Sequence, residues 1–538
     1  MNSKISPKLN LPQLFNSGLE LLQQGQSTKA QYLFLQVLSI NPNHFDSLHL
    51  LGLIAAKDKK PELALEWIGR AINVNPKDAS VHYNYGVALA ELNCLDDAIV
   101  SYRYAIKLRP EYFDAIYNLG NVLKECRRYE EAIDCYKRAI DLKPQDANVY
   151  CNLGNLFKEI NRYEEALACY EIAITINPNN ADVYCNLGIV FKDLKRIDEA
   201  INCYDHAIHL KPTLVDAYWN KSTALLTAGD FEKGWELFNW RWKNKKLKFR
   251  EWKFKQPMWS GEALHLNKSL LLYNEQGVGE QILFASMLLN LTQLVANLKI
   301  IIEPRLVPLL KRSLPAIQYL DSNVNIEEIN FDFQLPIGDL GKFFRKSMRD
   351  FDASRQQFMY VDVNRAKELR AKAVKKKKML CGITWNSKNK DIGISKSVRL
   401  QDFLPLFKLQ DISFVSLQYD VSKQDINEFN QLHNTEIYFC EEVDNFNDLD
   451  GHAALIHACD FIVSISNTTA HLAGAIGKKT YLLYPSGVGA LWYWANQVNQ
   501  KSVWYPSVEI FQQSNFGSWF EPIANIVKTI STNLNDLK

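Results

Sequence analysis

The chain lacks the features of several large classes of protein. Its 62 lysines and arginines against 60 aspartates and glutamates leave a net charge of only +2, too small for a protein that binds nucleic acid by neutralising phosphates. No stretch approaches the roughly 20 apolar residues that a membrane-spanning helix needs. The first residues, MNSKISPKLNLPQLF, contain no apolar segment of a secretory signal. We therefore expect a cytoplasmic protein without a membrane span and without nucleic acid as a partner.

The ten cysteines form no metal-binding or disulfide pattern. No two are spaced CxxC, and Cys135, Cys169 and Cys203 follow one another at intervals of 34 residues, as do Cys151 and Cys185. Cysteines at a constant interval belong to a repeated structural unit rather than to a metal centre. The sequence therefore predicts neither a bound metal nor a disulfide framework.

The length and composition predict several folded units. At 538 residues the chain is several times longer than the usual domain of roughly 100 to 200 residues. Hydrophobic residues make up 47% of the chain and charged residues 23%, which supplies enough apolar side chains for packed cores.

A period of 34 residues runs through the first half of the chain. Each unit, as in NLGNVLKECRRYEEAIDCYKRAIDLKP, has two apolar runs at helical spacing, a short polar turn between them and a final proline. Glycine and alanine at fixed places allow the two helices of a unit to approach closely. The recurring residues are Pro42, Pro76, Pro110, Pro144, Pro178 and Pro212; Gly52, Gly86, Gly120, Gly154 and Gly188; and Ala30, Ala64, Ala98, Ala132, Ala166 and Ala200.

These positions resemble the tetratricopeptide repeat over about residues 11–244. The resemblance implies an α-solenoid of about six stacked helix pairs, because a single pair cannot bury its apolar face. Stacking creates an extended groove, which implies a protein or peptide partner. The recurring Tyr102, Tyr136, Tyr170 and Tyr204 are expected to pack between the helices.

Asparagine recurs at one position of the first helix of each unit. A primary amide can both donate and accept, so a row of amides can pair with successive backbone amides of an extended polypeptide. The row resembles the asparagine ladder in the repeats of the eukaryotic protein O-GlcNAc transferases. Asparagine is also common at this place in tetratricopeptide repeats generally, so a purely structural role is the alternative. The expected peptide-binding residues are Asn84, Asn118, Asn152, Asn186 and Asn220.

Aromatic residues gather where the repeat pattern decays, around an expected junction over residues 245–261. Aromatic side chains buried between a solenoid and a globular domain would fix the orientation of the two. Tryptophan interleaved with lysine and arginine also permits stacking on nucleic acid, but we favour the structural seam. The tryptophans concerned are Trp235, Trp240, Trp242, Trp252 and Trp259.

From Ser269 onward, short apolar runs of strand length alternate with helical stretches. Such alternation predicts parallel sheets with crossover helices. We expect two α/β lobes, residues 262–362 and 379–538, joined by a linker over residues 363–378. The lysine run at the end of that linker is interpreted as a solvated helix end.

Two segments that follow expected strands carry candidate binding groups. In the first, EQGVGE, Gly277 and Gly279 permit a tight turn, with Glu275 and Glu280 beside it. In the second, NSKNKDIGISKSVR, cations on a loop can reach a phosphate, although isolated cations are usually surface charge. These cations are Lys388, Lys390, Lys396 and Arg399.

A third segment, FIVSISNTTAHLAGAIG, is the most informative. An apolar strand ends in Ser466, Asn467, Thr468 and Thr469, and a helix of small residues begins near Ala470. Hydroxyl groups and free backbone N–H groups at a helix N-terminus form an anion site. An ordinary N-cap followed by a packed helix would also satisfy these residues.

With these segments in order, residues 235–530 resemble the GT-B glycosyltransferases of the ADP-heptose heptosyltransferase type, glycosyltransferase family 9. Further matching segments are GITWNS, FVSLQ and SVWYPSVEIF. The resemblance implies two Rossmann-like lobes, the first on the acceptor side and the second on the nucleotide-sugar side. It also implies inverting, metal-independent transfer of a hexosyl or heptosyl group, with the nucleotide-sugar as co-substrate and without another cofactor.

The same resemblance implies roles for individual residues. Glu280 matches the aspartate of a Gly-Asp pair that acts as the base, so glutamate here keeps the chemistry on a longer arm. Ser466 and Asn467 stand where the family often has Asp-Thr, which removes a carboxylate. His452 and His457 offer no third ligand at metal spacing. The expected donor-binding residues are Lys396, Ser397, Gln418, Ser466, Asn467, Thr468, Thr469 and His471.

The sequence therefore predicts a glycosyltransferase whose repeats recruit a protein or glycan acceptor. The alternative is a scaffold whose transferase half has lost catalysis and only binds partners. The two departures, Gly-Glu for Gly-Asp and Ser-Asn for Asp-Thr, favour that alternative, whereas the cationic loop and the order of the segments favour the enzyme.

Overall fold

The computed structural model describes residues 10–247, 252–321, 328–351, 357–374, 379–389 and 392–536. The chain forms two compact units, Met1–Val183 and Tyr184–Lys538. Their division falls within α11 (Ala181–Asp193), well before the end of the repeats at residue 244 that the sequence predicts. The second unit thus contains repeat helices as well as the α/β half. Lys390 and the lysine run Lys375–Lys378 lie outside the described residues.

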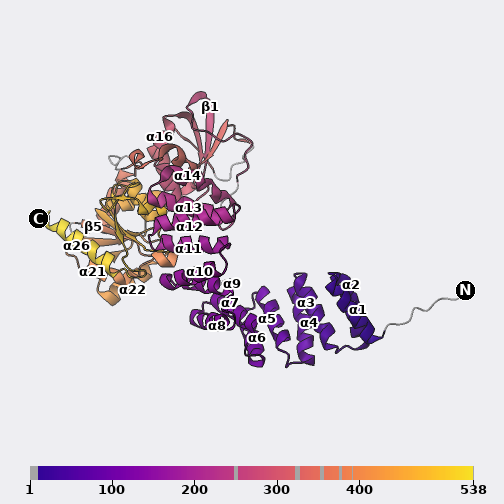
Figure 1. The fold of residues 1–538 in the computed structure, drawn as a ribbon. Helices are drawn as coiled ribbons and strands as arrows, with labels where there is room; N and C mark the ends of the chain where they lie inside the picture. Colours follow the sequence, from indigo (N-terminus) through magenta and orange to yellow (C-terminus); the bar gives the residue numbers. More distant parts are fainter. Residues whose placement is uncertain are drawn as a thin grey trace. The chain divides into compact units, whose positions relative to one another are not determined.

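The first unit is a series of antiparallel helix pairs, as the 34-residue period predicts (Figure 1). The first helix of each pair has 13 residues and the second has 14. Its helices are α1 (Leu11–Gln23), α2 (Ser27–Ile40), α3 (Phe45–Lys57), α4 (Pro61–Val74), α5 (Ala79–Glu91), α6 (Leu95–Leu108), α7 (Phe113–Glu125), α8 (Tyr129–Leu142), α9 (Ala147–Glu159) and α10 (Tyr163–Ile176).

The turn between the two helices of every pair contains a residue in the left-handed conformation. That conformation ends the first helix and reverses the chain within a few residues. Glycine occupies this position in the first and last pairs, and larger residues occupy it in between. The residues, with their φ angles, are Gly25 (76°), Lys59 (58°), Asn93 (60°), Arg127 (58°), Asn161 (61°), Lys195 (62°) and Gly229 (83°).

The recurring tyrosines pack between helices, which confirms the sequence prediction. Tyr136 and Tyr170 are fully buried, and each ring lies against the glycine of the preceding helix. A methyl group added at Gly154 would come within 2.8 Å of the Tyr170 ring, and one at Gly188 within 2.6 Å of the Tyr204 ring. The small residue is therefore required by the aromatic side chain that fills the space.

In the second unit, the repeat helices continue as α12 (Ile197–Leu210), α13 (Val215–Ala228) and α14 (Phe231–Phe238), followed by a short 3-10 helix, η1 (Asn239–Lys243). Trp235 and Trp259 are buried in the same core as the α/β strands, as the predicted seam requires. The Trp235 indole donates to the Arg345 carbonyl oxygen at 2.7 Å. The Asn496 side chain donates to the Leu226 carbonyl oxygen at 2.8 Å.

A buried ion-pair cluster fastens η1 to the first α/β lobe. The Arg241 guanidinium is fully buried and lies 3.0 Å from Glu275 and 2.6 Å from Asp339. Burial raises the pKa of Glu275, while Arg241 opposes that shift. Glu275 opens the EQGVGE segment, so Arg241 connects the end of the repeats to the turn that precedes Glu280.

The first lobe contains a four-stranded parallel sheet in the order β3-β2-β1-β4. Residues 257–259 extend its edge, because Met258 pairs with Gln334 of β4. The strands are β1 (Leu264–Tyr273), β2 (Val295–Ile301), β3 (Gln318–Leu320) and β4 (Phe333–Pro336), with helices α15 (Val278–Ala285), α16 (Leu288–Thr292), α17 (Val307–Ser313) and α18 (Gly341–Phe344) and the 3-10 helices η2 (Pro304–Leu306), η4 (Ile337–Leu340) and η5 (Met348–Asp350).

The second lobe contains an eight-stranded sheet in the order β10-β11-β12-β9-β8-β5-β6-β7. The strands from β12 to β7 in this order are parallel, and β10 and β11 form an antiparallel edge. The strands are β5 (Met379–Ile383), β6 (Ile412–Ser416), β7 (Ile437–Tyr438), β8 (Phe461–Ile465), β9 (Thr480–Tyr484), β10 (Gln497–Val498), β11 (Lys501–Ser502) and β12 (Val508–Gln512).

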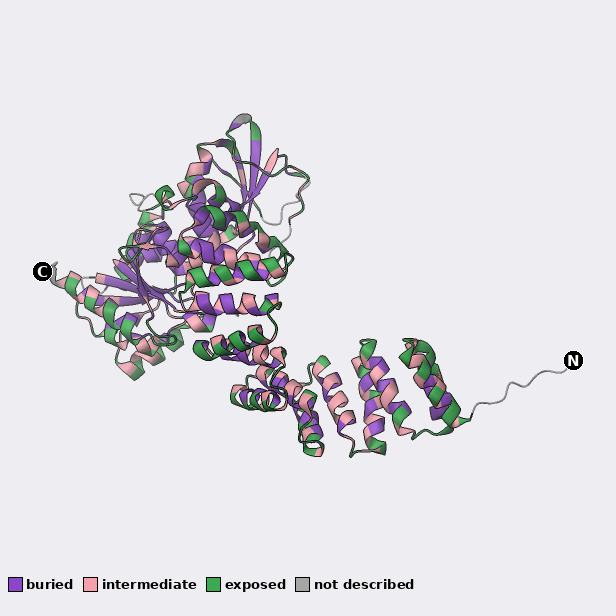
Figure 2. Cartoon of the chain, viewed as in Figure 1, coloured by how far each residue is buried: buried purple, intermediate pink, exposed green. Residues whose placement is uncertain are grey.

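Helices cover both faces of this sheet, and its central strands are buried (Figure 2). Successive strands run outward from β5 in one direction and from β8 in the other. In open α/β sheets, ligands bind at such a reversal, beyond the carboxyl ends of the two strands. The helices are α20 (Gly393–Lys396), α21 (Leu404–Phe407), α22 (Lys423–His433), α23 (Leu449–Ala458), α24 (Thr468–Ala475), α25 (Trp492–Ala495) and α26 (Phe520–Asp536), with the 3-10 helix η6 (Leu400–Phe403).

The expected linker is structured over most of its length. Residues Val363–Ala373 form α19, which is held against α23. Arg370 pairs with Asp460 at 2.8 Å, and Arg365 pairs with Asp448 at 2.6 Å. Among the described residues, no helix is both long enough and apolar enough to cross a membrane.

Candidate functional site

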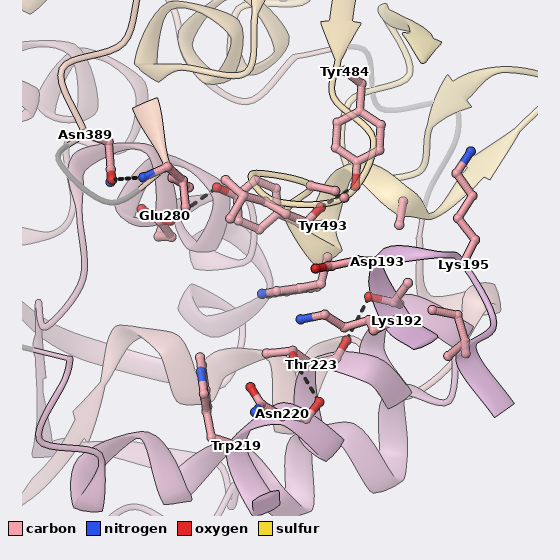
Figure 3. A pocket seen from close by; sticks show the side chains of 18 of the residues that line it. Lys192, Asp193, Lys195, Trp219, Asn220, Thr223, Glu280, Asn389, Tyr484 and Tyr493 are labelled. Atoms are coloured by element: carbon pink, nitrogen blue, oxygen red, sulfur yellow. Dashed lines mark hydrogen bonds between the residues drawn. The ribbon is translucent and has the colours of Figure 1, made fainter. Parts of the chain in front are cut away.

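A pocket of about 610 Å³ opens between the last repeat helices and the loops of both α/β lobes, all within the second unit. Helix α13 supplies Trp219, Asn220 and Thr223, and the end of α11 supplies Lys192 and Asp193. On the opposite side lie Glu280 and the segment after β9, which contains Tyr493 (Figure 3). The pocket therefore brings the predicted base and one of the predicted ladder asparagines to the same cavity.

Glu280 lies in the first turn of α15, which begins after the glycine turn. The Tyr493 hydroxyl donates a hydrogen bond to its Oε1 atom at 3.2 Å. Burial and the neighbouring carboxylate raise the pKa of Tyr493 well above its usual value. Tyr493 is therefore a neutral hydrogen-bond donor that orients the Glu280 carboxylate toward the pocket.

His471, on α24, lies against Gly279, the residue before Glu280. Its ring is so close to Gly279 that a side chain there would meet the His471 Cδ2 atom at 2.8 Å. His471 Nδ1 is 2.9 Å from the Tyr505 hydroxyl. Burial lowers the pKa of His471 to about 3, and nearby Lys396 adds to the shift. The imidazole is thus neutral and packed between the lobes, as a structural residue would be.

Lys396 is exceptional among the predicted donor-binding residues because it is a buried cation. Its side chain is only 6% exposed, yet none of the described residues forms a hydrogen bond or an ion pair with its ammonium group. Burial lowers the pKa of Lys396, and the carboxylate of Glu280 opposes that shift. A buried cation without a partner is costly, so the site has an unmet preference for an anion.

The turn after β8 combines satisfied and unsatisfied groups. Asn467 caps α24 by accepting from the Ala470 N–H, and its amide donates to the Thr384 hydroxyl at 3.1 Å. This is the N-cap role that the sequence left as an alternative. The Ser466 hydroxyl is buried without a hydrogen-bond partner among the described residues. Thr468 is half-buried at the first position of the helix.

The Thr469 hydroxyl is hydrogen-bonded to a histidine, His452. Asn445 donates its amide to the Gln418 carbonyl oxygen, so its oxygen faces His452 Nδ1 at 2.7 Å. Nδ1 must then carry the proton, and Nε2 accepts from the Thr469 hydroxyl at 3.0 Å. Burial lowers the pKa of His452 to about 4, which keeps the ring neutral. The Thr469 hydroxyl proton therefore points at His452.

Gln418 and Ser397 hold the loop that follows β5. The Gln418 amide accepts from the Trp385 and Asn386 N–H groups and donates to two carbonyl oxygens. The Ser397 hydroxyl accepts from the Ser387 N–H and donates to the Gly393 carbonyl oxygen. Both side chains shape the loop, and their predicted contacts with a nucleotide-sugar stay predictions.

The ladder asparagines form hydrogen bonds to the preceding repeat. Asn84, Asn118, Asn152 and Asn220 each donate their amide to a side chain 35 residues earlier, on the first helix of the preceding pair. The partners are His49 for Asn84 (2.8 Å), Tyr83 for Asn118 (3.1 Å), Tyr117 for Asn152 (2.6 Å) and Cys185 for Asn220 (3.7 Å).

This arrangement uses the donor end of these asparagine amides and leaves their acceptor end for a ligand. Within the described residues, the side-chain oxygens of Asn84, Asn118, Asn152 and Asn220 accept no hydrogen bond. A ligand along the first unit would therefore meet the acceptors of Asn84, Asn118 and Asn152 and would have to supply donors. Asn186 lies at the same register on α11 and is half-buried.

Sequence reasoning did not identify several residues of the pocket. Tyr493 and Trp492 lie in a short aromatic run after β9, and their chemistry depends on which loops meet them. Lys192 is half-buried and Thr223 is buried, and neither residue stands out in the repeat pattern. The run Trp492–Trp494 is the one local signal that could have indicated this wall. Among the described residues, no three histidine, cysteine, aspartate or glutamate side chains are grouped closely enough to hold a metal ion.

Comparison with known proteins identifies one curated relative and several solved structures. The chain is 27% identical over 329 residues to Protein FlbA of Caulobacter vibrioides, an alignment that covers 57% of this chain and 54% of FlbA. The chain thus spans about half the length of that relative.

Several solved structures are similar to part of the chain. PilF of Pseudomonas aeruginosa is 23% identical and covers 38% of this chain and 94% of its own, with a TM-score of 0.34. YrrB, described as a TPR protein with an unusual peptide-binding site, is 21% identical and covers 34% of this chain and 95% of its own, with a TM-score of 0.31.

Sequence families identify the repeats directly. Residues 88–125, 121–160 and 154–195 match the family described as "TPR repeat". Residues 181–214 match the family "Tetratricopeptide repeat". The chain therefore carries tetratricopeptide repeats, and these repeats form the helix pairs of its first half.

Proposed function

We propose that the protein is a glycosyltransferase that moves a sugar from a nucleotide-sugar to a hydroxyl group of an acceptor recruited by the repeats. The observation that carries the proposal is Lys396, a buried cation that has no partner among the described residues and lies close to the carboxylate of Glu280. It lies near the reversal of strand order between β5 and β8, where α/β sheets bind nucleotides. A diphosphate is the anion that this position would accommodate.

The chemistry assigns one role to each group. Glu280 accepts the proton of the acceptor hydroxyl as its oxygen bonds to the anomeric carbon. The bond from that carbon to the diphosphate breaks, and the electron pair leaves with the diphosphate. Lys396, the Ser466 hydroxyl and the backbone N–H groups at the start of α24 stabilise the charge that develops there. Attack from the side opposite the leaving group inverts the anomeric centre, and no metal takes part.

The repeats supply the other wall of the pocket, which supports a role for them in acceptor binding. Asn220 belongs to the asparagine row and also lines the cavity that contains Glu280. Tetratricopeptide repeats are typical protein-binding modules, and an extended polypeptide offers the backbone N–H donors that the asparagine oxygens require. A protein acceptor fits this arrangement directly, and a glycan hydroxyl is the other acceptor chemistry that Glu280 could deprotonate.

A non-catalytic scaffold is the second candidate, and specific contacts favour it. Several predicted donor-binding residues form side-chain hydrogen bonds within the protein, namely Ser397, Gln418, Asn467 and Thr469. A degenerate transferase would keep such residues for stability alone. The two candidates differ in one measurable property, because only the enzyme requires a donor site that depends on Lys396.

The first experiment is a thermal-shift screen of the full chain against ADP-, GDP-, UDP- and CMP-linked sugars. A ligand that binds only the folded protein raises its melting temperature by mass action. With the sugar nucleotide that gives a shift, Lys396→Met should weaken binding about 10- to 100-fold, since a charge-assisted hydrogen bond is lost. Lys423→Met is the matched control, because Lys423 is an exposed lysine of the same lobe that pairs with Glu441 at 2.6 Å.

Glu280→Gln separates binding from catalysis. The variant should bind the same sugar nucleotide within a few-fold of the unmodified protein and transfer sugar at least about 100-fold more slowly. Transfer at the unmodified rate would refute the role of Glu280. Absence of a shift with every sugar nucleotide, in a folded sample, would favour the scaffold.

A further inference from the structure

A second hollow, of about 710 Å³, lies at the antiparallel edge of the large sheet, against α26. We call it the polar hollow. Gln512 lines both the polar hollow and the pocket that contains Glu280, so the two spaces adjoin at β12. The polar hollow is lined by Gln497, Gln500, Ile510, Phe511, Gln512, Pro522, Asn525, Lys528, Thr529, Thr532 and Asn533.

The composition of the polar hollow differs from that of an ordinary solvated surface. Seven of its eleven residues are glutamine, asparagine or threonine, one is lysine, and none is acidic. Helix α8, by contrast, carries charges of both signs, with Glu131, Asp134, Lys137 and Arg138. The polar hollow instead gathers uncharged amides and hydroxyls around one cavity.

Two of the five amides in the polar hollow are bonded within the protein, since Gln497 donates to the Trp494 carbonyl oxygen and Asn533 donates to the Tyr481 hydroxyl. Within the described part of the chain, the side chains of Gln500, Gln512 and Asn525 make no hydrogen bond. Thr529 and Thr532 each donate to a carbonyl oxygen of α26, which leaves their oxygen atoms as acceptors. A planar amide presents a donor and an acceptor side by side, which matches the neighbouring hydroxyl groups of a sugar ring.

The backbone that presents Gln500 is strained. Asn499 and Gln500 form the two-residue turn between β10 and β11, with φ angles of 52° and 64°. Turns of this kind favour glycine at the second position, because other side chains are disfavoured at positive φ. Here the turn keeps a glutamine, whose side chain lines the polar hollow.

We propose that the polar hollow binds a neutral oligosaccharide. Gln500 and Gln512 from the sheet edge and Asn525 from α26 would contact the sugar hydroxyls. Phe511, which packs with Ile523 and Ile526 of α26, is the apolar side chain on the α26 side of the sheet. This inference needs no transfer reaction, although the shared Gln512 would allow a bound glycan to extend toward the pocket of Glu280.

The test is saturation-transfer NMR on the full chain with maltohexaose, cellohexaose and tetra-N-acetylchitotetraose, followed by titration of the sugar that binds. Gln500→Gly removes the side chain and relieves the turn. We expect this variant to melt no lower than the unmodified protein and to bind the sugar about 3- to 10-fold more weakly. Asn525→Ala, on the opposite wall, should weaken binding by a similar factor.

The matched control is Asn499→Gly, which changes the neighbouring residue of the same turn outside the polar hollow and should leave the affinity unchanged. Three results would overturn the proposal: no saturation transfer to any of the three sugars, equal loss of affinity in the control, or unchanged affinity in Gln500→Gly. Binding is measured without a donor. A failed transfer assay therefore leaves this site standing, and a failed sugar titration leaves the transferase proposal standing.

Discussion

The environment of the Tyr204 hydroxyl leads to a prediction that tests how the repeats are packed. Tyr136 and Tyr170 each donate to an asparagine 15 residues earlier, Asn121 and Asn155, at 2.7 Å. The equivalent residue for Tyr204 is Ile189. The Tyr204 hydroxyl is consequently buried with no partner in the described structure.

The magnitude follows from the cost of an unsatisfied polar group. A buried hydroxyl without a partner costs about 1 to 3 kcal/mol, whereas a typical satisfied one contributes about 1 kcal/mol. Tyr204→Phe should therefore raise the free energy of local unfolding by about 1 kcal/mol. Tyr170→Phe leaves the Asn155 oxygen without its donor and should lower it by about 1 kcal/mol. The two substitutions are chemically identical and are predicted to have opposite signs.

The assay is hydrogen exchange of the full chain, read by mass spectrometry over α10 and α12. Exchange resolves local openings, which a single melting curve of a repeat array does not. Ile189→Asn completes the comparison, because it offers Tyr204 a partner and should make Tyr204→Phe destabilising in its background. Destabilisation by Tyr204→Phe in the unmodified protein would refute the reasoning.

Two further predictions concern the second unit. A fragment of residues 181–538 should fold, whereas a fragment of residues 245–538 should be sensitive to protease. The shorter fragment loses three large aromatic side chains of α14, whose burial is worth roughly 5 to 9 kcal/mol. It also loses Arg241, the partner of the buried carboxylates of Glu275 and Asp339. Equal protease resistance of the two fragments would contradict the shared core. The pKa of His452 is about 4 in the folded protein and about 6.5 when unfolded, so stability should fall as the pH drops from 6.5 toward 4, by up to about 1.4 kcal/mol per pH unit. Urea titrations across that range should show a shallower dependence for His452→Gln, and an unchanged slope would refute the assignment.

Periodicity made the helix pairs predictable from sequence, since each pair repeats the same local rules. The glycine positions and the burial of Tyr136 and Tyr170 followed from the small and large residues that alternate between neighbouring helices. The parallel strands were likewise predictable from their short apolar runs. In each case the information lies within a few tens of residues.

The limits of the second unit were less predictable, because they depend on contacts far apart in the chain. The repeat pattern extends to residue 244, but the Trp235 indole bonds to a carbonyl oxygen 110 residues later. Likewise, no local pattern indicates that Tyr493 reaches Glu280 across 213 residues. Gln418 illustrates a different limit, because a glutamine that binds a ligand and one that clamps a loop look the same in sequence.

Helix α13 is both a repeat helix and a wall of the pocket, and this limits how the protein can evolve. A duplication or loss of repeats near the end of the array would replace Trp219, Asn220 and Thr223 and so rebuild the cavity. A duplication among the earlier helix pairs would leave those three residues in place. Repeat number is therefore expected to vary among related proteins at the amino-terminal side, while the last two pairs are inherited together with the α/β half.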